Sequence, residues 1–395
     1  MAETRKASRF IVPVAVAGVA AATIGLVPAL AASGDPDLPE ITAQQLIEKI
    51  AASDTQTLSG TFKISTDLGL PALDGLASGL GGLDGDGGPS SADPSEKLTE
   101  LFSGSHTLRV AADGPERQKL TLLDGSDEYS LIHNGDDVWG YDSKSNEAFH
   151  EKGASSGAPD ANEKDRKLPG TPKELADEVL KAAGDTTSIT VDGTAKVAGR
   201  DAYQLVIKPK QAGSTVESVK IAVDAANGTP LKFTLSSVEG GKPVVDAGFT
   251  KVDFGKPAAS EFTFTAPKGA KVTEGGAEKA KDSAEDLPEG FEDFGKGFPG
   301  LGAGFGGEGG DMNVIGEGWT TIARIDSGAP APKTDEAPKE IQGFLDSFGD
   351  KVTGKFGSGT VFKTKLVNAL LTDDGKVYVG AVTKDALVNA ANAAK

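Results

Sequence analysis

The sequence predicts an α+β fold, in which an antiparallel sheet is covered on one side by two helices and is followed by a small C-terminal α+β module. Segments in which apolar and polar residues strictly alternate recur between residues 105 and 265. This period of two is typical of strands with one buried and one solvent-facing side. Two amphipathic helical patterns accompany these strands, and a stretch rich in glycine and phenylalanine separates them from the C-terminal region.

Each helix has a recognisable start. The first is expected over Ile41–Ser53, where Thr42 and Gln45 form the pattern of a capping box. The second is expected from Thr171 to Gly184, because a capping residue, a proline and an acidic residue follow one another at its beginning and a glycine ends it. Both carry an apolar stripe on one face, formed by Leu46, Ile47 and Ile50 in the first and by Leu175, Val179 and Leu180 in the second.

Strands are expected on both sides of the second helix. The first is Thr57–Thr66, and Phe249–Phe254 and Phe262–Thr265 are expected to complete the sheet. Tight turns are indicated at Asn134-Gly135 and Asn227-Gly228. Between these points the alternating apolar pairs are Phe62 and Ile64, Leu108 and Val110, Leu120 and Leu122, Tyr129 and Leu131, Tyr203 and Leu205, Val219 and Ile221, and Phe233 and Leu235.

Two glycine-rich stretches divide the chain. Residues 68–93 are interpreted as a Gly-, Leu- and Asp-rich insertion within a first domain, 41–275, and residues 276–312 as an acidic, Gly/Phe-rich linker. Residues 313–395 are the small C-terminal α+β module. Its expected elements are a strand at Trp319–Ile325, a helix at Lys339–Phe348, a hairpin of Phe362–Leu371 with Lys376–Val382, and a helix at Lys384–Ala394.

The N-terminus, residues 1–31, has the three parts of a signal peptide. Basic residues precede an apolar run over residues 10–30, which ends in the small-x-small pattern Ala29-Leu30-Ala31. The run is also long enough to span a membrane, so an uncleaved signal anchor is the alternative. Basic residues stay on the cytoplasmic side in both cases. We therefore expect an exported protein, either in the cell envelope or secreted, or anchored by residues 10–30.

Composition excludes several classes of function. The formal net charge is −18, and such a chain repels nucleic-acid phosphates, so no nucleic-acid partner is expected. The chain has no cysteine, hence no disulfide and no cysteine for a lipid anchor. The three histidines, His106, His133 and His150, have no spacing typical of a zinc site.

Motifs of catalysis and cofactor binding occur only out of context. Residues 153–157 match a nucleophile elbow and residues 302–307 match G-x-G-x-x-G, but neither lies between a strand and a helix. Residues 84–88 begin like a calcium loop and place glycine where a third oxygen ligand belongs. The sequence therefore predicts a non-catalytic protein without metal or cofactor. An apolar space between sheet and helices would be either a packed core or a ligand cavity, and alternation does not separate the two.

A series of motifs in chain order resembles the LolA/LolB/LppX-like lipoprotein-localisation superfamily, which also includes the RseB-like N-terminal domain. The resemblance covers the chain from Ile41 to about Val272. It is carried by the amphipathic first helix and by the segments Leu58–Phe62, Gly114–Arg117, Asn134–Asp142, Val197–Leu205 with Pro209, Val223–Pro230, Phe249–Phe254 and Phe262–Pro267.

This resemblance implies an unclosed antiparallel half-barrel with a helical lid and an apolar cavity for acyl chains. The protein would then be an exported carrier of lipid or lipoprotein. The alternative is an RseB-like regulatory module that binds an exported protein or the outer domain of a membrane anti-sigma factor. The residues expected to line the cavity are Phe62, Ile64, Leu108, Val110, Leu120, Leu122, Tyr129, Leu131, Trp139, Tyr203, Leu205, Ile221, Phe233, Leu235 and Phe262.

Overall fold

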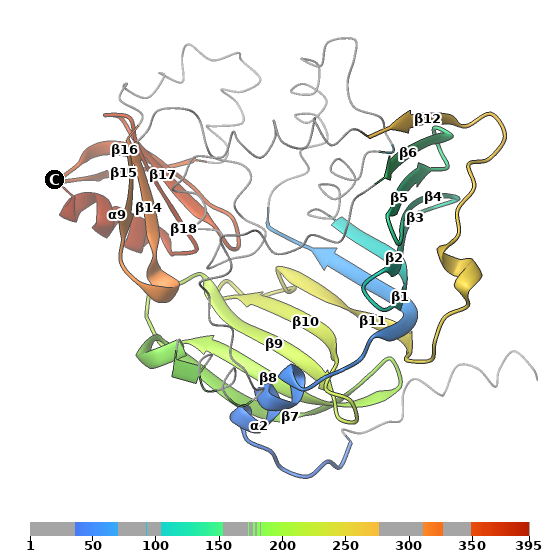
Figure 1. The fold of residues 1–395 in the computed structure, drawn as a ribbon. Coiled ribbons are helices and arrows are strands. Elements are labelled where there is room, and N and C mark those ends of the chain that lie inside the picture. Colours follow the sequence, from blue (N-terminus) through green and yellow to red (C-terminus); the bar gives the residue numbers. More distant parts are fainter. Residues whose placement is uncertain are drawn as a thin grey trace, which may run out of the picture.

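The computed structural model contains a large sheet, a small sheet and short helices (Figure 1). It describes residues 36–69, 92, 104–152, 173, 177, 180–181, 183–275, 311–326 and 349–394. The predicted signal peptide, nearly all of the two glycine-rich stretches and the expected helix at Lys339–Phe348 lie outside the described residues.

Twelve strands form the large sheet in the order β12-β6-β5-β4-β3-β2-β1-β11-β10-β9-β8-β7. All neighbours pair antiparallel except β12, which runs parallel to β6. The strands are β1 Thr57–Thr66, β2 Gly104–Asp113, β3 Arg117–Asp124, β4 Asp127–Asn134, β5 Asp137–Asp142, β6 Glu147–Lys152, β7 Thr187–Val197, β8 Arg200–Pro209, β9 Val216–Asp224, β10 Pro230–Ser237, β11 Val245–Asp253 and β12 Lys271–Glu274.

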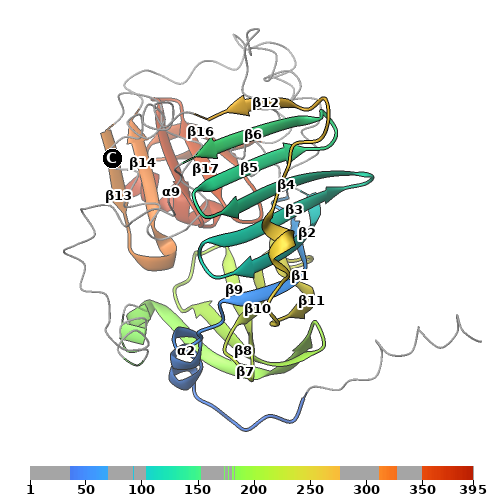
Figure 2. The same cartoon turned by 45° about the vertical axis from the view of Figure 1, so that its right-hand side comes forward.

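The large sheet is two antiparallel meanders joined by one strand. Strands β2–β6 form one meander and β7–β11 the other, and β1 pairs with both β2 and β11. The sheet bends strongly between the two meanders, and its end strands, β12 and β7, do not pair with each other (Figure 2). This arrangement is an unclosed antiparallel half-barrel, and it confirms the predicted fold class.

Helix α2, Ala43–Ala51, lies across β7 and β8 and starts as predicted. The Thr42 hydroxyl accepts from the Gln45 N–H at 3.2 Å, and the Gln45 side chain accepts from the Thr42 N–H at 2.8 Å. Residues 173, 177, 180, 181 and 183 are helical, as expected for the second helix. This helix is joined to α2 by a 3.0 Å hydrogen bond from the Gln44 side chain to Asp177. Two helices thus lie together at one end of the sheet.

The predicted turn at Asn134-Gly135 is present but is shifted by one residue. Asn134 pairs with Asp137 as the last residue of its strand, so the loop consists of Gly135, with a φ of 64°, and Asp136. In the β7–β8 hairpin, Val197 pairs with Arg200 across Ala198 and Gly199, which have φ values of 51° and 79°. Two successive positive φ values suit the right-handed twist of the flanking strands.

The small sheet has the order β13-β14-β18-β17-β16-β15 and is antiparallel throughout. Helix α9, Lys384–Ala393, packs on one of its faces, and its Leu387 and Ala391 lie in a cluster with Val361, Leu370 and Tyr378. The strands are β13 Asp311–Ile315, β14 Ile322–Asp326, β15 Gly349–Gly354, β16 Gly357–Phe362, β17 Asn368–Thr372 and β18 Lys376–Gly380.

Three expected strands differ from the structure. The strand expected at Trp319–Ile325 begins only at Ile322, because Gly318–Thr320 form a 3-10 turn, η6. The segment Phe362–Leu371 is not one strand, because β16 ends at Phe362 and β17 begins at Asn368. The turn across residues 373–375 and the second strand, which begins at Lys376, are as predicted. Phe262–Thr265 is not a strand either. A 3-10 turn, η5 (Ala259–Phe262), stands at its start, and Phe262 is 1% exposed against β3 and β4. The segment crosses the sheet instead of pairing at its edge.

The two sheets are joined through backbone hydrogen bonds and a shared apolar cluster. The Thr215 N–H donates to Ala381 O at 2.9 Å, and the Lys365 N–H donates to Leu68 O at 2.8 Å. The cluster, called the junction below, contains Val216, Val244, Leu366, Leu68, Leu235, Val245, Trp319, Val367 and Ala381. One end of the large sheet and one end of the small sheet are therefore held against each other.

No helix within the described ranges is long and apolar enough to cross a membrane.

Candidate functional site

The strand registers place most of the predicted cavity residues on one face of the large sheet, called the inner face below. Side chains directly opposite each other on paired strands share a face. One row runs from Leu205 through Ile221, Phe233 and Ala247 to Ile64. Further rows on the same face hold Phe62, Leu108, Leu122 and Tyr129, then Val110, Leu120 and Leu131. Tyr203 and Leu235 share the face by alternation within β8 and β10.

At the β7–β9 end, helix α2 turns the inner face into a packed core. Tyr203 is 7% exposed and Leu205 is 3% exposed, and both pack against Leu46 and Ile47 of the helix. The Tyr203 hydroxyl donates to Pro39 O at 3.0 Å, which fixes the chain entering α2. Here the predicted cavity residues are ordinary core residues.

Beyond α2 the inner face is open only in places. Leu108 and Leu122 are 4% and 5% exposed and pack with Tyr129, whereas the residues nearer to β10 are less covered. Phe233, in the middle of the row, is 37% exposed, although it is aromatic and flanked by apolar residues. Phe62 meets the ring of Phe249 edge-on, with the ring centroids 5.2 Å apart. Ile64, Val110, Leu120, Leu131, Ile221 and Leu235 are all half-buried.

A fragment of the first glycine-rich stretch lies on the inner face at β4 and β5. The carbonyl of Ala92 accepts from the Tyr129 hydroxyl at 3.0 Å. A Cβ placed on Gly140 would stand 2.4 Å from the same carbonyl, so glycine is required for this approach. Ala92 itself is fully buried. Tyr129 is therefore covered by backbone and is 6% exposed.

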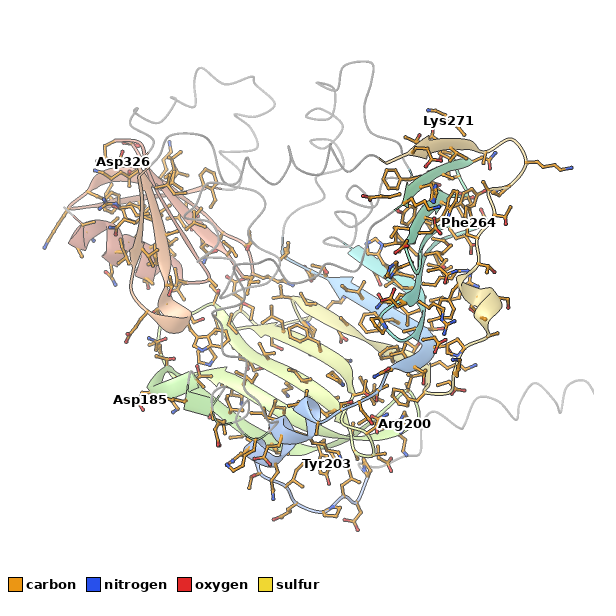
Figure 3. All side chains as sticks on the ribbon, viewed as in Figure 1. Asp185, Arg200, Tyr203, Phe264, Lys271 and Asp326 are labelled. Carbon is orange, nitrogen blue, oxygen red and sulfur yellow. The ribbon has the colours of Figure 1, made fainter. Side chains whose placement is uncertain are left out.

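Trp139 and Phe262 lie on the opposite, outer face, which corrects the predicted set. Trp139 pairs with Ile132, whereas Leu131 pairs with Gly140, so Trp139 faces away from Leu131. The Trp139 ring contacts Phe264 at a centroid distance of 5.2 Å, on the side of β4 and β5 away from the small sheet (Figure 3). The expectation that only one side of the sheet is covered is therefore wrong at β3–β5, where residues 259–264 pack on the outer face.

Inner-face residues were also missed. Ala247 and Phe249 belong to the rows above but were not expected to line the cavity. The period-two alternation of Val245, Ala247 and Phe249 was the available signal.

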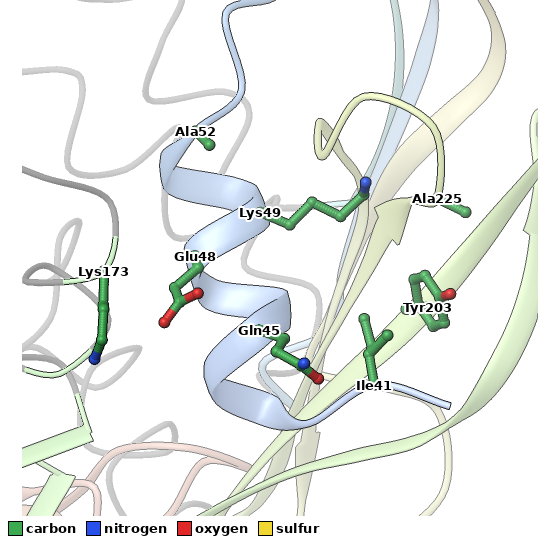
Figure 4. A pocket seen from close by; sticks show the side chains of 8 residues that line it. All are labelled: Ile41, Gln45, Glu48, Lys49, Ala52, Lys173, Tyr203 and Ala225. Carbon is green, nitrogen blue, oxygen red and sulfur yellow. The ribbon is translucent and has the colours of Figure 1, made fainter. Parts of the chain in front are cut away.

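An open groove of about 600 Å³ lies beside α2, between the helix and the turn after β9 (Figure 4). Charged and amide side chains of α2 line much of it, and in Figure 4 Lys173 lies across α2 from Ala225. Its lining differs from that of an acyl cavity. The lining residues are Ile41, Gln45, Glu48, Lys49, Ala52, Lys173, Tyr203 and Ala225.

Two of the motifs that carry the superfamily resemblance meet in a buried ion pair. Arg200 pairs with Asp224, whose side chain is 1% exposed, and its guanidinium lies 4.7 Å from the ring centroid of Phe254. Burial by itself would raise the pKa of Asp224. The hydrogen bonds from Arg200 and from the backbone N–H groups of Asn227 and Ala226 outweigh burial and hold the pKa below its usual value. The motif residues therefore support the hairpin and the turn structurally.

The side chain of His150 makes contacts that stabilise the fold. Its ring stacks on Trp139 at 3.9 Å, and its two nitrogens lie 2.9 Å from Asp137 and 2.9 Å from Glu274. On the outer face, these contacts link Glu274 of β12 to His150 of the neighbouring strand β6. Across the described residues, no group of three or more His, Cys, Asp or Glu side chains is arranged to hold a metal ion.

Comparison with known proteins finds similarity at the level of structure only. No family model and no curated protein matches the chain. The MucA/MucB complex of Pseudomonas aeruginosa matches with 15% identity and a TM-score of 0.37, covering 88% of this chain and 96% of that one. A LolA superfamily protein of Nitrosomonas europaea matches with 12% identity and a TM-score of 0.20, covering 57% and 99%.

A putative outer membrane lipoprotein-sorting protein domain of Vibrio parahaemolyticus is also similar, with 11% identity and a TM-score of 0.21, covering 56% of this chain and 95% of that one. These superpositions are loose over the whole chain, and the architecture rests on this chain's own strand pairing.

Proposed function

We propose that the protein is an exported, non-catalytic carrier that binds the acyl chains of a lipid or lipoprotein on the inner face of its half-barrel. The observation that carries the proposal is Phe233, which is 37% exposed at the centre of a continuous apolar row. In a packed core such a residue is covered, and an exposed aromatic within a concave apolar face marks a ligand surface.

Energetics supports an acyl ligand. Burying a chain of about fourteen carbons contributes roughly 10 kcal/mol, at about 0.8 kcal/mol per CH₂ group. The loss of translational and rotational freedom on binding offsets several kcal/mol of this. The remainder corresponds to an affinity of roughly micromolar strength, which suits a carrier that must also release its cargo. No cation or metal is needed in such a site.

The proposed assignment of the chain follows from this function. Residues 1–31 would direct export, as a cleaved signal peptide or as an anchor. Residues 41–275 would form the lipid-binding domain, 276–312 a linker and 313–395 a second module held at the junction. N-terminal sequencing of the exported form tests the first assignment, since cleavage predicts a start near Ala32.

The binding proposal is tested by uptake of a fluorescent fatty acid, with native mass spectrometry of the purified protein. Phe233→Arg should abolish most of the uptake, because an ion placed in the apolar row must be desolvated when the acyl chain binds. Val272→Arg is the matched control, since Val272 is a 43% exposed apolar residue of β12. It pairs with Ala148, which shares the outer face with Tyr141. If wild-type protein takes up no probe and carries no lipid mass, the proposal fails.

The alternative function is binding of another exported protein. A MucB structure in complex with MucA(peri) is among the similar structures, and that match covers 88% of this chain. By analogy, the partner here would be an exported protein or the outer domain of a membrane anti-sigma factor. Capture of such a protein, together with an apo mass and no probe uptake, would favour this alternative over the carrier.

A further inference from the structure

The large sheet carries a group of cationic side chains on its outer face, called the basic patch below. Its members alternate along their strands with inner-face residues, as Lys63 does with Phe62 and Lys232 does with Phe233. They stand on five neighbouring strands, β9, β10, β11, β1 and β2. The members of the basic patch are Lys63, Arg109, Lys220, Lys232 and Lys251.

The strand registers bring these cations close together. Lys63 and Lys232 both lie opposite Gly248, which has no side chain to separate them. Lys251 and Arg109 likewise lie opposite one and the same residue of β1. Because neighbouring strands are about 4.8 Å apart, the two members of each pair start from backbone positions roughly 10 Å apart. The cations are thus collected in one area of the sheet.

Acidic side chains neutralise the basic patch only in part. Two of its five cations are paired at 2.9 Å, Lys232 with Asp246 and Arg109 with Glu128. The other three are exposed, and none of them has an acidic partner among the residues that the structure describes.

The remaining acidic residues on this face of the same strands do not change that result. Asp113 and Asp224 are buried in ion pairs of their own. Asp253 is exposed at the end of β11 and offsets one further cation. The basic patch therefore keeps an excess of positive charge, on a chain whose formal net charge is −18.

The composition of the basic patch fits an anionic lipid surface. Interfaces between proteins are depleted of lysine and are anchored by aromatic side chains. Here four of the five cations are lysines, and hydroxyl side chains such as Thr61 and Thr234 lie between them. Lysine is a flexible point charge, and clusters of such charges attract anionic headgroups. Salt screens exposed charges beyond about 8 Å at physiological ionic strength, so the acidic remainder of the molecule opposes this attraction only weakly.

We propose that the basic patch docks the protein on the surface of a bilayer that contains anionic phospholipids. The proposal stands on the charge and register of the outer face and does not require the carrier function. With the outer face against the headgroups, the inner face with Phe233 is turned away from the bilayer. Docking and acyl binding thus use opposite sides of the same sheet.

Cosedimentation of the full chain with phosphatidylcholine vesicles, with and without phosphatidylglycerol, tests the proposal. The patch variant combines Lys63→Gln, Lys220→Gln and Lys251→Gln. The matched control removes three exposed lysines outside the basic patch and so has the same net charge; its changes are Lys144→Gln, Lys351→Gln and Lys355→Gln. Residues 1–31 are identical in all three proteins, so they produce no difference between them. Circular dichroism and thermal unfolding establish that each variant is folded.

The wild-type protein and the control are expected to bind vesicles that contain phosphatidylglycerol and to be released at about 1 M salt. The patch variant should partition roughly 100-fold less, since each lysine near an anionic surface contributes about a fivefold factor. If the patch variant does not fold, Lys251→Gln alone should show the fivefold loss.

Equal binding by the patch variant and the control overturns the proposal. Wild-type binding that is absent, or that does not depend on phosphatidylglycerol, also overturns it. Uptake of a fluorescent fatty acid by the same three proteins keeps the two functions apart. Uptake that persists while vesicle binding fails leaves the carrier function standing, and vesicle binding without uptake leaves only docking.

Discussion

Two stretches of the same inner face differ in what covers them. On β8 and β9, Leu205 and Val223 lie under α2 and are 3% and 0% exposed. On β10, one strand further along the row, Phe233 is 37% exposed. Because the residue types and the alternation are alike, the difference in exposure results from coverage by α2. A short helix tied to one end of a long sheet converts that end into core and leaves Phe233 on the next strand partly exposed.

The largest effect should come from a cavity beneath α2. Leu205→Ala is expected to lower the free energy of unfolding by about 2–5 kcal/mol, because a fully buried leucine leaves a void that its neighbours fill only partly. Phe233→Ala should cost less, about 1–2 kcal/mol, because its ring is already in part exposed. Urea denaturation measures both. Equal losses for the two variants would remove the distinction between covered and open stretches.

The contact between α2 and the turn after β9 offers a second test. Gly228 has a φ of 78°, and an added Cβ would stand 2.3 Å from Lys49 O at the end of α2. Gly228→Ala should therefore cost more than the roughly 1–2 kcal/mol of a left-handed alanine alone. Gly125→Ala is the control, with a φ of 59° and no atom within 4 Å of its Cβ. A thermal unfolding curve for Gly228→Ala that overlays that of Gly125→Ala would show that α2 is not held by this turn.

The ion pair below the same turn predicts a pH dependence. The pKa of Asp224 is lower in the folded protein than its ordinary value of 3.8. Its contribution to stability is therefore fully present above the unfolded pKa and is lost as the pH falls through the folded pKa. Asp224→Asn should lower the free energy of unfolding by about 1–3 kcal/mol at pH 7, because hydrogen bonds to the charged group weaken.

This deficit should shrink as the pH is lowered from 5 toward 3, in a series of urea titrations of both proteins. The control is Asp201→Asn, which removes an exposed carboxylate that pairs with Lys196 in the same hairpin. A deficit that stays constant down to acid pH would mean that Asp224 stabilises the fold by shape and not by charge.

The smallest effect is expected at the start of α2. Thr42→Ala removes the 3.2 Å hydrogen bond to the Gln45 N–H and should cost about 1 kcal/mol. Thr42→Ser keeps the hydroxyl and should cost less. If fraying of α2 uncovers Tyr203 and Leu205, fatty-acid uptake rises in Thr42→Ala but not in Thr42→Ser. Unchanged uptake would mean that the site ends before the edge of α2.

Local sequence by itself determined the strands with clear alternation, the start of α2 and the residues of the inner face. The alternation around Phe62, Leu108 and Leu205 places these residues on one side, because successive side chains in a strand point to opposite faces. Thr42 and Gln45 mark the first helical turn, because their hydrogen bonds span only three residues. Each of these features depends on residues that lie within a few positions of one another in the sequence.

Only the tertiary structure decided which parts of that face are core. Phe262 and Trp139 are also aromatic, yet both lie on the outer face: the register of β5 turns Trp139 there, and the segment around Phe264 crosses that face and brings Phe262 with it. Other contacts also join residues that lie far apart in the chain. They are the packing of α2 on the sheet, the approach of Ala92 to Gly140, and the junction that includes Leu235 and Leu366. Periodicity specifies the face of the sheet to which a side chain points. Segments that are distant in the chain pack on that face and decide which residues the side chain contacts.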